Sequence, residues 1–254
     1  MPTPWSYDAI AEVYATDMGQ SMPFDDVGWY RTLALQRAGA TLELGCGTGR
    51  ILLELLAAGV QAIGMDRSLP MLRRLQREAR PRALAPRLVQ GDLADLPFAP
   101  AARFATILLP YSLITYVLAR DAAVDLLRRL AALLEPQGLI VLDAFVPQAV
   151  ASFSDFRLDY RRPHGRDTLQ REKRIDARAD GCNRIERRYR LLDAAGRELQ
   201  SFTTTETIRP YAPDALRDLA ARAGCRIERV AWDYDQGGSA TGARFASLLL
   251  RAGH

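Results

Sequence analysis

Short apolar runs alternate with helical patterns along residues 41–145, and this alternation is the feature that most limits the fold. The runs ATLEL, VQAIGMD, RLVQGD, RFATILLP and GLIVLDAF have the length of strands, and segments of helical period follow most of them. Strand–helix–strand repeats predict a parallel sheet covered by helices on both faces. The last run is apolar at almost every position, as expected of a central parallel strand.

The period changes after Pro147. Residues 168–211 alternate at period two, with turns at Asp180-Gly181 and Ala195-Gly196, which predicts an antiparallel meander of three strands. A helix over 213–224 and two strands, 225–235 and 244–251, then complete the first sheet. We therefore predict an α/β fold with a doubly wound, seven-stranded, mostly parallel, Rossmann-like sheet. Residues 1–147 and 209–254 form its core, with N-terminal cap helices, and residues 148–208 form an inserted antiparallel three-stranded lid over the substrate.

The composition is ordinary for a globular protein, with 48% hydrophobic and 25% charged residues. No apolar run approaches the roughly 20 residues that cross a bilayer, and no secretory signal is visible, so we expect a cytoplasmic protein without a membrane partner. The three cysteines are far apart and predict neither a disulfide framework nor a metal site. The net charge of +4 indicates a nucleic-acid partner only weakly, because a basic footprint needs clustering on one face.

An acidic, glycine-rich turn follows the first strand, in the sequence LELGCGTGR. Glycine permits a positive φ and lets a ligand approach the main chain, and the N–H groups of a helix beginning near Thr48 would face that ligand. The glycine pattern of sites that bind nicotinamide dinucleotides would need glycine where this chain has Arg50, so the sequence does not match that class of site. Tight packing of strand against helix is the structural alternative for such a turn.

Two aspartates stand at the carboxyl ends of the next strands, Asp66 in AIGMD and Asp92 in VQGDLADLPF. Strand ends of a doubly wound sheet open on one crevice, where an acid after the second strand can bind the hydroxyls of a ribose. Taken singly, each aspartate is equally consistent with a cap or a loop. Together with the glycine turn, they predict a site for an adenosine-type ligand.

These motifs, together with LLEPQGLIVLDAF, resemble the ordered motifs of class I S-adenosylmethionine-dependent methyltransferases over roughly residues 41–145. The resemblance implies a methyltransferase fold with S-adenosylmethionine as cofactor and S-adenosylhomocysteine as product. It implies that Asp66 holds the ribose, that Asp92 and Leu93 contact the adenine, and that Glu43 organises the turn from beneath. The other implied cofactor contacts are Gly45, Cys46, Gly47, Thr48, Gly49, Arg67, Leu109 and Pro110, and Tyr111 would lie with Leu109 and Pro110 near the sulfonium.

Candidates for catalysis and acceptor binding carry weaker signals. The segment YDAIAEVYATDM resembles the N-terminal cap helix of small-molecule methyltransferases, in which a tyrosine often approaches the cofactor, although packing explains its tyrosines equally well. His164, one of two histidines with His254, is either a base or an exposed turn residue. We predict catalytic roles for His164, Tyr111 and Tyr14, cofactor contacts for Tyr14 and Arg31, acceptor contacts for Tyr7, Tyr111, Tyr116 and Tyr234, and no metal.

The predicted reaction is methyl transfer to nitrogen or oxygen of a small-molecule metabolite or natural-product intermediate. LLPYSL lacks the polar residue and first proline of the (Asp/Asn)-Pro-Pro-Tyr motif of enzymes that methylate bases or glutamine amides. The arginine-rich insertion keeps an RNA acceptor open as an alternative, and a non-methylating protein that binds the cofactor is a third. An exposed antiparallel sheet also makes us expect a homodimer.

Overall fold

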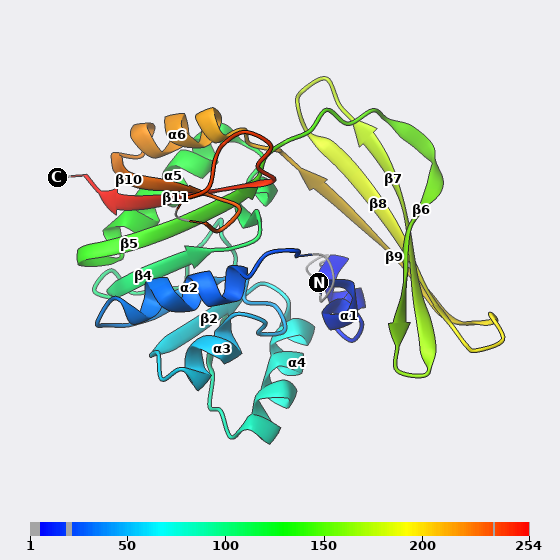
Figure 1. Ribbon diagram of the computed structural model, residues 1–254. Coiled ribbons are helices and arrows are strands. Elements are labelled where there is room, and N and C mark those ends of the chain that lie inside the picture. Colours follow the sequence, from blue (N-terminus) through cyan, green and yellow to red (C-terminus); the bar gives the residue numbers. More distant parts are fainter. Residues whose placement is uncertain (1–5, 19–21, 236, 254) are drawn as a thin grey trace. The chain divides into compact units, whose positions relative to one another are not determined.

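The computed structural model describes residues 6–18, 22–235 and 237–253, and the chain divides into two compact units (Figure 1). The core unit comprises Phe24–Pro147 and Pro210–His254. The sheet unit comprises Met1–Pro23 and Gln148–Arg209. None of the described helices is long and apolar enough to cross a membrane.

The core unit contains a seven-stranded sheet in the order β10–β11–β5–β4–β1–β2–β3. The five strands from β3 to β5 are parallel, whereas β11 runs antiparallel to both β5 and β10. This arrangement confirms the predicted doubly wound, mostly parallel sheet. Its strands are β1 (Thr41–Leu44), β2 (Ala62–Asp66), β3 (Arg87–Gln90), β4 (Phe104–Leu109), β5 (Leu134–Phe145), β10 (Cys225–Trp232) and β11 (Phe245–Ala252).

Helices lie between β1 and β2, between β2 and β3 and between β4 and β5, and α6 precedes the antiparallel pair β10 and β11. The α-helices of the core unit are α2 (Asp26–Leu35), α3 (Leu52–Ala57), α4 (Leu69–Ala79), α5 (Arg120–Ala132) and α6 (Pro213–Arg222). Two short 3-10 helices are η2 (Arg80–Arg82) and η3 (Leu113–Tyr116). The N-cap Asp25 starts α2 by accepting a hydrogen bond from the Gly28 N–H, 2.8 Å away.

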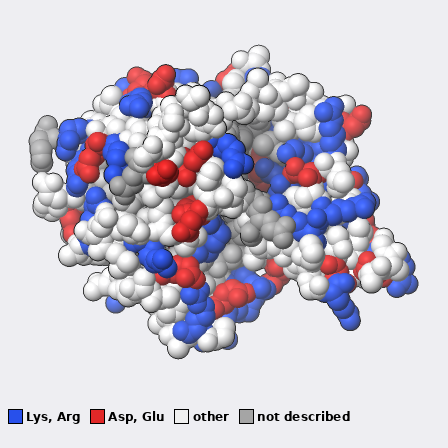
Figure 2. All heavy atoms as spheres, viewed as in Figure 1, with Lys and Arg blue, Asp and Glu red and all other residues white. Residues whose placement is uncertain are grey.

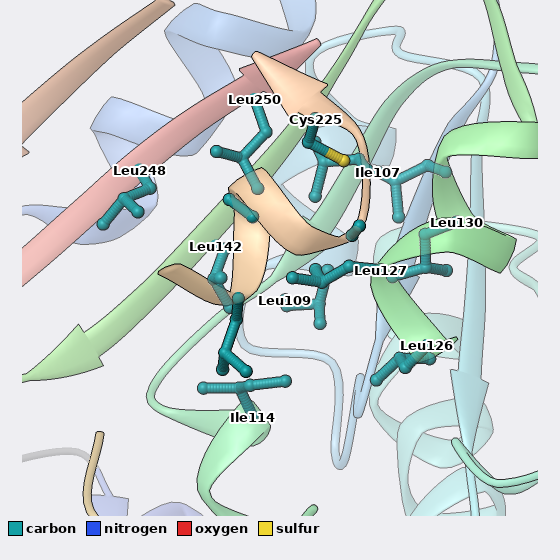
Figure 3. Packing of buried hydrophobic residues seen from close by; sticks show 14 of the residues in the cluster. Ile107, Leu109, Ile114, Leu126, Leu127, Leu130, Leu142, Cys225, Leu248 and Leu250 are labelled. Carbon is teal, nitrogen blue, oxygen red and sulfur yellow. The ribbon is translucent and has the colours of Figure 1, made fainter. Parts of the chain in front are cut away.

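Alternation along the central strands divides the core between two faces of the sheet. Ile107, Leu109 and Leu142 pack with Leu127 and Leu130 of α5 in one buried cluster (Figure 3). The intervening residues, Glu43 on β1 and Asp143 on β5, point to the opposite face, where Asp143 contacts Tyr30 of α2. Two buried carboxyl groups therefore lie on the second face, and both belong to the candidate site described below.

The sheet unit is an antiparallel meander of four strands, one more than the sequence predicted. The additional strand β6 alternates apolar and polar residues only over 156–160, and none of its side chains is buried. Charge supports its pairing, because Asp159 forms ion pairs with Arg171 and Lys173 on β7. The predicted turns at Asp180-Gly181 and Ala195-Gly196 are confirmed. The strands are β6 (Phe153–His164), β7 (Asp167–Ala177), β8 (Asn183–Leu192) and β9 (Glu198–Ile208).

The N-terminal segment packs within the sheet unit. The single cap helix expected over residues 7–14 is a 3-10 helix, η1 (Ser6–Ile10), followed after a turn by α1 (Tyr14–Met18). Asp17 of α1 is buried and accepts hydrogen bonds from Tyr160 and Arg171, and from the Tyr189 hydroxyl at 3.1 Å. A buried carboxylate with three donors ties the start of the chain to this sheet.

Candidate active site

The glycine turn begins where the sequence predicted, since β1 ends at Leu44, but α3 begins at Leu52 rather than near Thr48. Gly45, Gly47 and Gly49 have φ values of +65°, +53° and +91°, which a right-handed helix cannot accommodate. Residues 45–51 therefore form a longer irregular turn before the helix. The turn leaves more main chain at the carboxyl edge of the sheet than the sequence suggested.

Packing explains part of the glycine requirement. A Cβ added to Gly45 would lie 2.9 Å from Leu113 Cδ1, and one at Gly49 would lie 2.7 Å from Leu75 Cγ. Cys46 is buried against β2, where a Cβ on Gly64 would lie 2.8 Å from its Sγ. Leucine side chains thus press directly on the turn, and bulkier residues at these positions would displace it.

Asp66, at the end of β2, lies against the glycine turn. Its Oδ2 accepts a hydrogen bond from the Gly47 N–H at 2.8 Å, and its Oδ1 accepts one from the Ser68 N–H at 2.7 Å. The same carboxylate therefore orients both the turn and the start of α4. Two sequence motifs that are 19 residues apart meet at one edge of the sheet, as the doubly wound topology predicts.

Asp92 lies beside this pair, in the loop after β3. Its Oδ2 is 3.2 Å from Nε of Arg67, and its Oδ1 accepts a hydrogen bond from the Ala94 N–H at 2.9 Å. Arg129 of α5 donates to the carbonyls of Leu93 at 3.2 Å and Ala94 at 3.1 Å, so the helix holds this loop in place. The role of Arg129 was not predictable, because an arginine on a helix face ordinarily points into solvent.

Glu43 is buried beneath the turn, 2% exposed. Burial raises its pKa to about 8, with Asp66 and Asp26 acting in the same direction and Arg50 and the Leu52 N–H opposing them. Its Oε2 has no hydrogen-bond partner among the described residues. Arg50 instead forms a two-point ion pair with the buried Asp26, at 2.6 and 2.7 Å, and so fastens the turn to α2. Glu43 is therefore largely protonated at neutral pH.

The chain after β4 adopts a strained turn. Leu109 and Pro110 are buried, and Tyr111 and Ser112 have φ values of +52° and +60°, in the left-handed region that residues other than glycine seldom occupy. The Tyr111 ring stacks on Phe245 of β11 at a centroid distance of 5.9 Å. Backbone strain of this kind persists only where the surroundings enforce it.

Asp143 holds this left-handed turn in place, and it was not among the residues predicted from the sequence. Its side chain is completely buried at the end of β5, and it accepts hydrogen bonds from the hydroxyls of Tyr30 and Tyr234 and from the Ser112 N–H at 3.0 Å. Burial raises its pKa to about 6, while the three hydrogen bonds lower it. The available signal was an aspartate inside the apolar run GLIVLDAF, because a charge in a central strand requires buried partners.

The remaining predicted residues divide between the two units. In the core unit, Arg31 is exposed on α2, Tyr116 is half-buried in η3, Thr48 is buried and Tyr234 donates its hydroxyl to Asp143. In the sheet unit, the rings of Tyr7 and Tyr14 contact each other edge to face at 5.8 Å. His164 is half-buried at the end of β6, with Nδ1 2.8 Å from Thr16 Oγ1. His254 lies outside the described residues, and the proposed roles of all these side chains stay predictions.

Most of the inserted arginines are paired with carboxylates of the same sheet. Figure 2 shows acidic side chains interspersed among the basic ones on the face in view. The ion pairs are Arg171 with Asp17 and Asp159, Lys173 with Asp159, Arg174 and Arg184 with Glu186, Arg178 with Asp176, Arg187 with Glu206, and Arg188 and Arg190 with Glu172. The insertion therefore presents a mixed charge pattern rather than a purely basic surface.

Comparison with known proteins agrees with this geometry. Residues 41–138 match the family model described as a methyltransferase domain. The chain is 31% identical to the cypemycin N-terminal methyltransferase of Streptomyces sp. over 174 residues, which are 66% of this chain and 68% of that protein. The fold is similar to that of the CcbJ methyltransferase from Streptomyces caelestis, with a TM-score of 0.82 and 24% identity over 99% of each chain. The fold is also similar to that of SAM-bound CalS10, an amino pentose methyltransferase from Micromonospora echinaspora involved in calicheamicin biosynthesis. The TM-score is 0.70 and the identity 20%, over 96% of this chain and 97% of that one.

The sheet order and its acidic, glycine-rich edge define a class I S-adenosylmethionine-dependent methyltransferase. The chain belongs to this family, and S-adenosylmethionine is its cofactor. The chemistry of the residues fits that ligand, since two carboxylates, Asp66 and Asp92, stand beside bare main chain at one edge. Such oxygens accept hydrogen bonds from ribose hydroxyls and from the adenine amino group.

Replacing Asp92 with alanine is expected to weaken cofactor binding by about tenfold, because one hydrogen bond to a charged group is lost without a cavity in the core. Titration calorimetry with S-adenosylhomocysteine measures the effect. Asp95→Ala, an exposed aspartate of the same loop, is the matched control and should bind as the wild type does. An unchanged affinity in Asp92→Ala would remove Asp92 from the adenine site.

Proposed function

We propose that the protein transfers the methyl group of S-adenosylmethionine to a nitrogen or oxygen of a small-molecule metabolite or natural-product intermediate, with an amine nitrogen favoured. The observation that carries the preference for nitrogen is the state of Asp143. It is the carboxylate nearest the strained turn after β4, yet it is fully buried and engaged by three donors. It is therefore not free to act as a base, and an amine presented in its neutral form needs no strong base.

The bound cofactor supplies a methyl group on a positively charged sulfur, and the chain supplies position. Asp66 and the glycine turn would hold the ribose and methionine portions, and Asp92 with Leu93 would hold the adenine. Pro110 and Tyr111 would border the acceptor side. Catalysis by such a site consists mainly of aligning acceptor, methyl group and leaving sulfur away from water.

The similar proteins support a small acceptor that contains nitrogen. One is named for methylating the N-terminus of cypemycin, and another for an amino pentose. The pairing of the inserted arginines supports a small molecule over RNA, because arginines committed to carboxylates are not available to replace the counterions of a phosphate backbone. Acceptor contacts of Tyr7, Tyr116 and Tyr234 and catalytic roles of Tyr14 and His164 stay predictions. A cover formed by residues 148–208, a cytoplasmic location and a homodimer stay predictions as well.

The test is methyl transfer from S-adenosylmethionine labelled with ¹³C in its methyl group to a panel of matched amines and alcohols. We expect labelled products from amines, with kcat/KM rising with pH until the acceptor amine is deprotonated. If only alcohols gave labelled products, the acceptor atom would be oxygen instead of nitrogen. Tight binding of the cofactor with no transfer to any acceptor would favour a non-methylating protein, and salt-sensitive binding of RNA would favour an RNA acceptor.

A further inference from the structure

The Asp143 carboxylate on β5 forms a buried hub with three residues from other parts of the core unit. Tyr30 comes from α2, Tyr234 follows β10, and Ser112 follows β4. Tyr30 and Asp143 are fully buried, and Tyr234 is 7% exposed. Burial and the neighbouring Asp143 carboxylate raise the pKa of both tyrosine hydroxyls, so both keep the protons that they donate.

The hub fixes the strained turn after β4 through two hydrogen bonds at Ser112. The Ser112 N–H donates to Asp143 Oδ1 at 3.0 Å, and the Ser112 Oγ accepts from the Phe145 N–H at 2.7 Å. Ser112 makes both interactions from a left-handed backbone conformation, with φ of +60°. A residue with φ of +60° gains nothing locally from that conformation, so the energy that holds it there comes from the buried partners.

The hub also reaches Tyr111 and the glycine turn through side chains. Phe245 stacks on Tyr111 at 5.9 Å and contacts Tyr234 at 5.5 Å, so Tyr111 is supported from the same cluster. Leu113, the residue after Ser112, lies against Gly45, where a Cβ would be only 2.9 Å from Leu113 Cδ1. A shift of Ser112 would therefore move a tyrosine on one side and press on the cofactor turn on the other.

We propose that Asp143, with Tyr30 and Tyr234, is a positioning residue for methyl transfer, which holds the Tyr111–Ser112 turn in the place that the reacting sulfur centre requires. Asp143 acts through Ser112, Tyr234 acts through Phe245 and Asp143, and Tyr30 acts through Asp143. The proposal rests on the proposed function, because it takes Tyr111 to border the sulfonium. It adds a second support to the site, on the face of the sheet opposite the main apolar core.

The test compares two cofactor analogues that differ only at the reacting centre. S-adenosylhomocysteine has a neutral sulfur there, whereas sinefungin has a carbon that bears an ammonium group, and titration calorimetry gives the dissociation constant of each. In Asp143→Asn and Tyr30→Phe we expect the affinity for S-adenosylhomocysteine to stay within about twofold, and the preference for sinefungin over it to change by about tenfold. Asp125→Asn, an exposed position on α5, is the matched control and should leave both constants unchanged.

The outcomes separate the inference from the proposed function. If Asp143→Asn and Tyr30→Phe are folded and the ratio of the dissociation constants for the two analogues does not change, the positioning role is overturned. The same holds if both analogues lose affinity equally. Loss of folding in both variants, seen by circular dichroism, would assign the hub to stability alone and would also overturn it. A wild-type protein that binds neither analogue would overturn the proposed function itself, and the inference with it, whereas the other results leave that function standing.

Discussion

Replacing Asp66 with alanine is expected to reduce the affinity for S-adenosylhomocysteine by about 100-fold. The carboxylate is proposed to accept hydrogen bonds from both ribose hydroxyls, and two such bonds to a charged group correspond to about 3 kcal/mol. The same carboxylate holds the Gly47 N–H at 2.8 Å and the Ser68 N–H at 2.7 Å, so its loss also loosens the turn that the cofactor contacts. Titration calorimetry measures the affinity directly and requires no acceptor.

Asp66→Asn is the matched variant, since asparagine keeps the size of the side chain and one accepting oxygen. Its affinity for S-adenosylhomocysteine should lie between those of the wild type and Asp66→Ala, about tenfold below the wild type. Thermal unfolding followed by circular dichroism shows whether each variant is folded at the temperature of the titration. A folded Asp66→Ala that binds within threefold of the wild type would show that the ribose is held elsewhere.

Replacing Glu43 with glutamine is expected to make the protein more stable at alkaline pH relative to the wild type. The pKa of Glu43 is about 8 in the folded chain and 4.5 ordinarily, so between these values the folded state retains a proton that the unfolded state has released. The free energy of unfolding of the wild type therefore falls as pH rises through this interval. The difference between the two pKa values corresponds to about 5 kcal/mol once the pH exceeds both.

Urea unfolding of both proteins at pH 5 and pH 8.5 tests this expectation without cofactor. Between these pH values the stability of the wild type, relative to Glu43→Gln, should fall by about 4 kcal/mol. Glu78→Gln serves as the control, because it makes the same chemical change at a half-exposed carboxylate that is paired with Arg74 on α4. Parallel pH profiles for the wild type and Glu43→Gln would mean that Glu43 is ionised in the folded chain.

Local pattern was enough to predict the sheet and the cofactor edge. The order of strands and helices over 41–145 predicts a doubly wound sheet, and in such a sheet the ends of neighbouring strands meet at one edge, which brings Gly47 and Asp66 together. The start of α3 was placed too early because helix propensity after Thr48 is high, whereas the positive φ of Gly49 excludes a helix there. Periodicity therefore located the turn but not its length.

Features that depend on distant partners were not predictable in this way. Strand β6 is rich in charged residues and became a strand because Asp159 finds Arg171 and Lys173 on β7. Tyr234 is predicted to contact the acceptor from its position after a strand, but the bond from its hydroxyl to Asp143 could not be predicted. A single sequence does not show that residues 30, 143 and 234 converge, because their separations of roughly one hundred residues carry no periodic signal.

The grouping of Met1–Pro23 with Gln148–Arg209 has a consequence for engineering. A chimera that exchanges only the insertion between two relatives would leave Asp17 facing a foreign sheet, without the tyrosines and arginine that neutralise it. Exchanging the proposed acceptor cover between two enzymes would therefore require both segments, the leading peptide and the distant insertion, to be moved together as a single cassette encoded in two places.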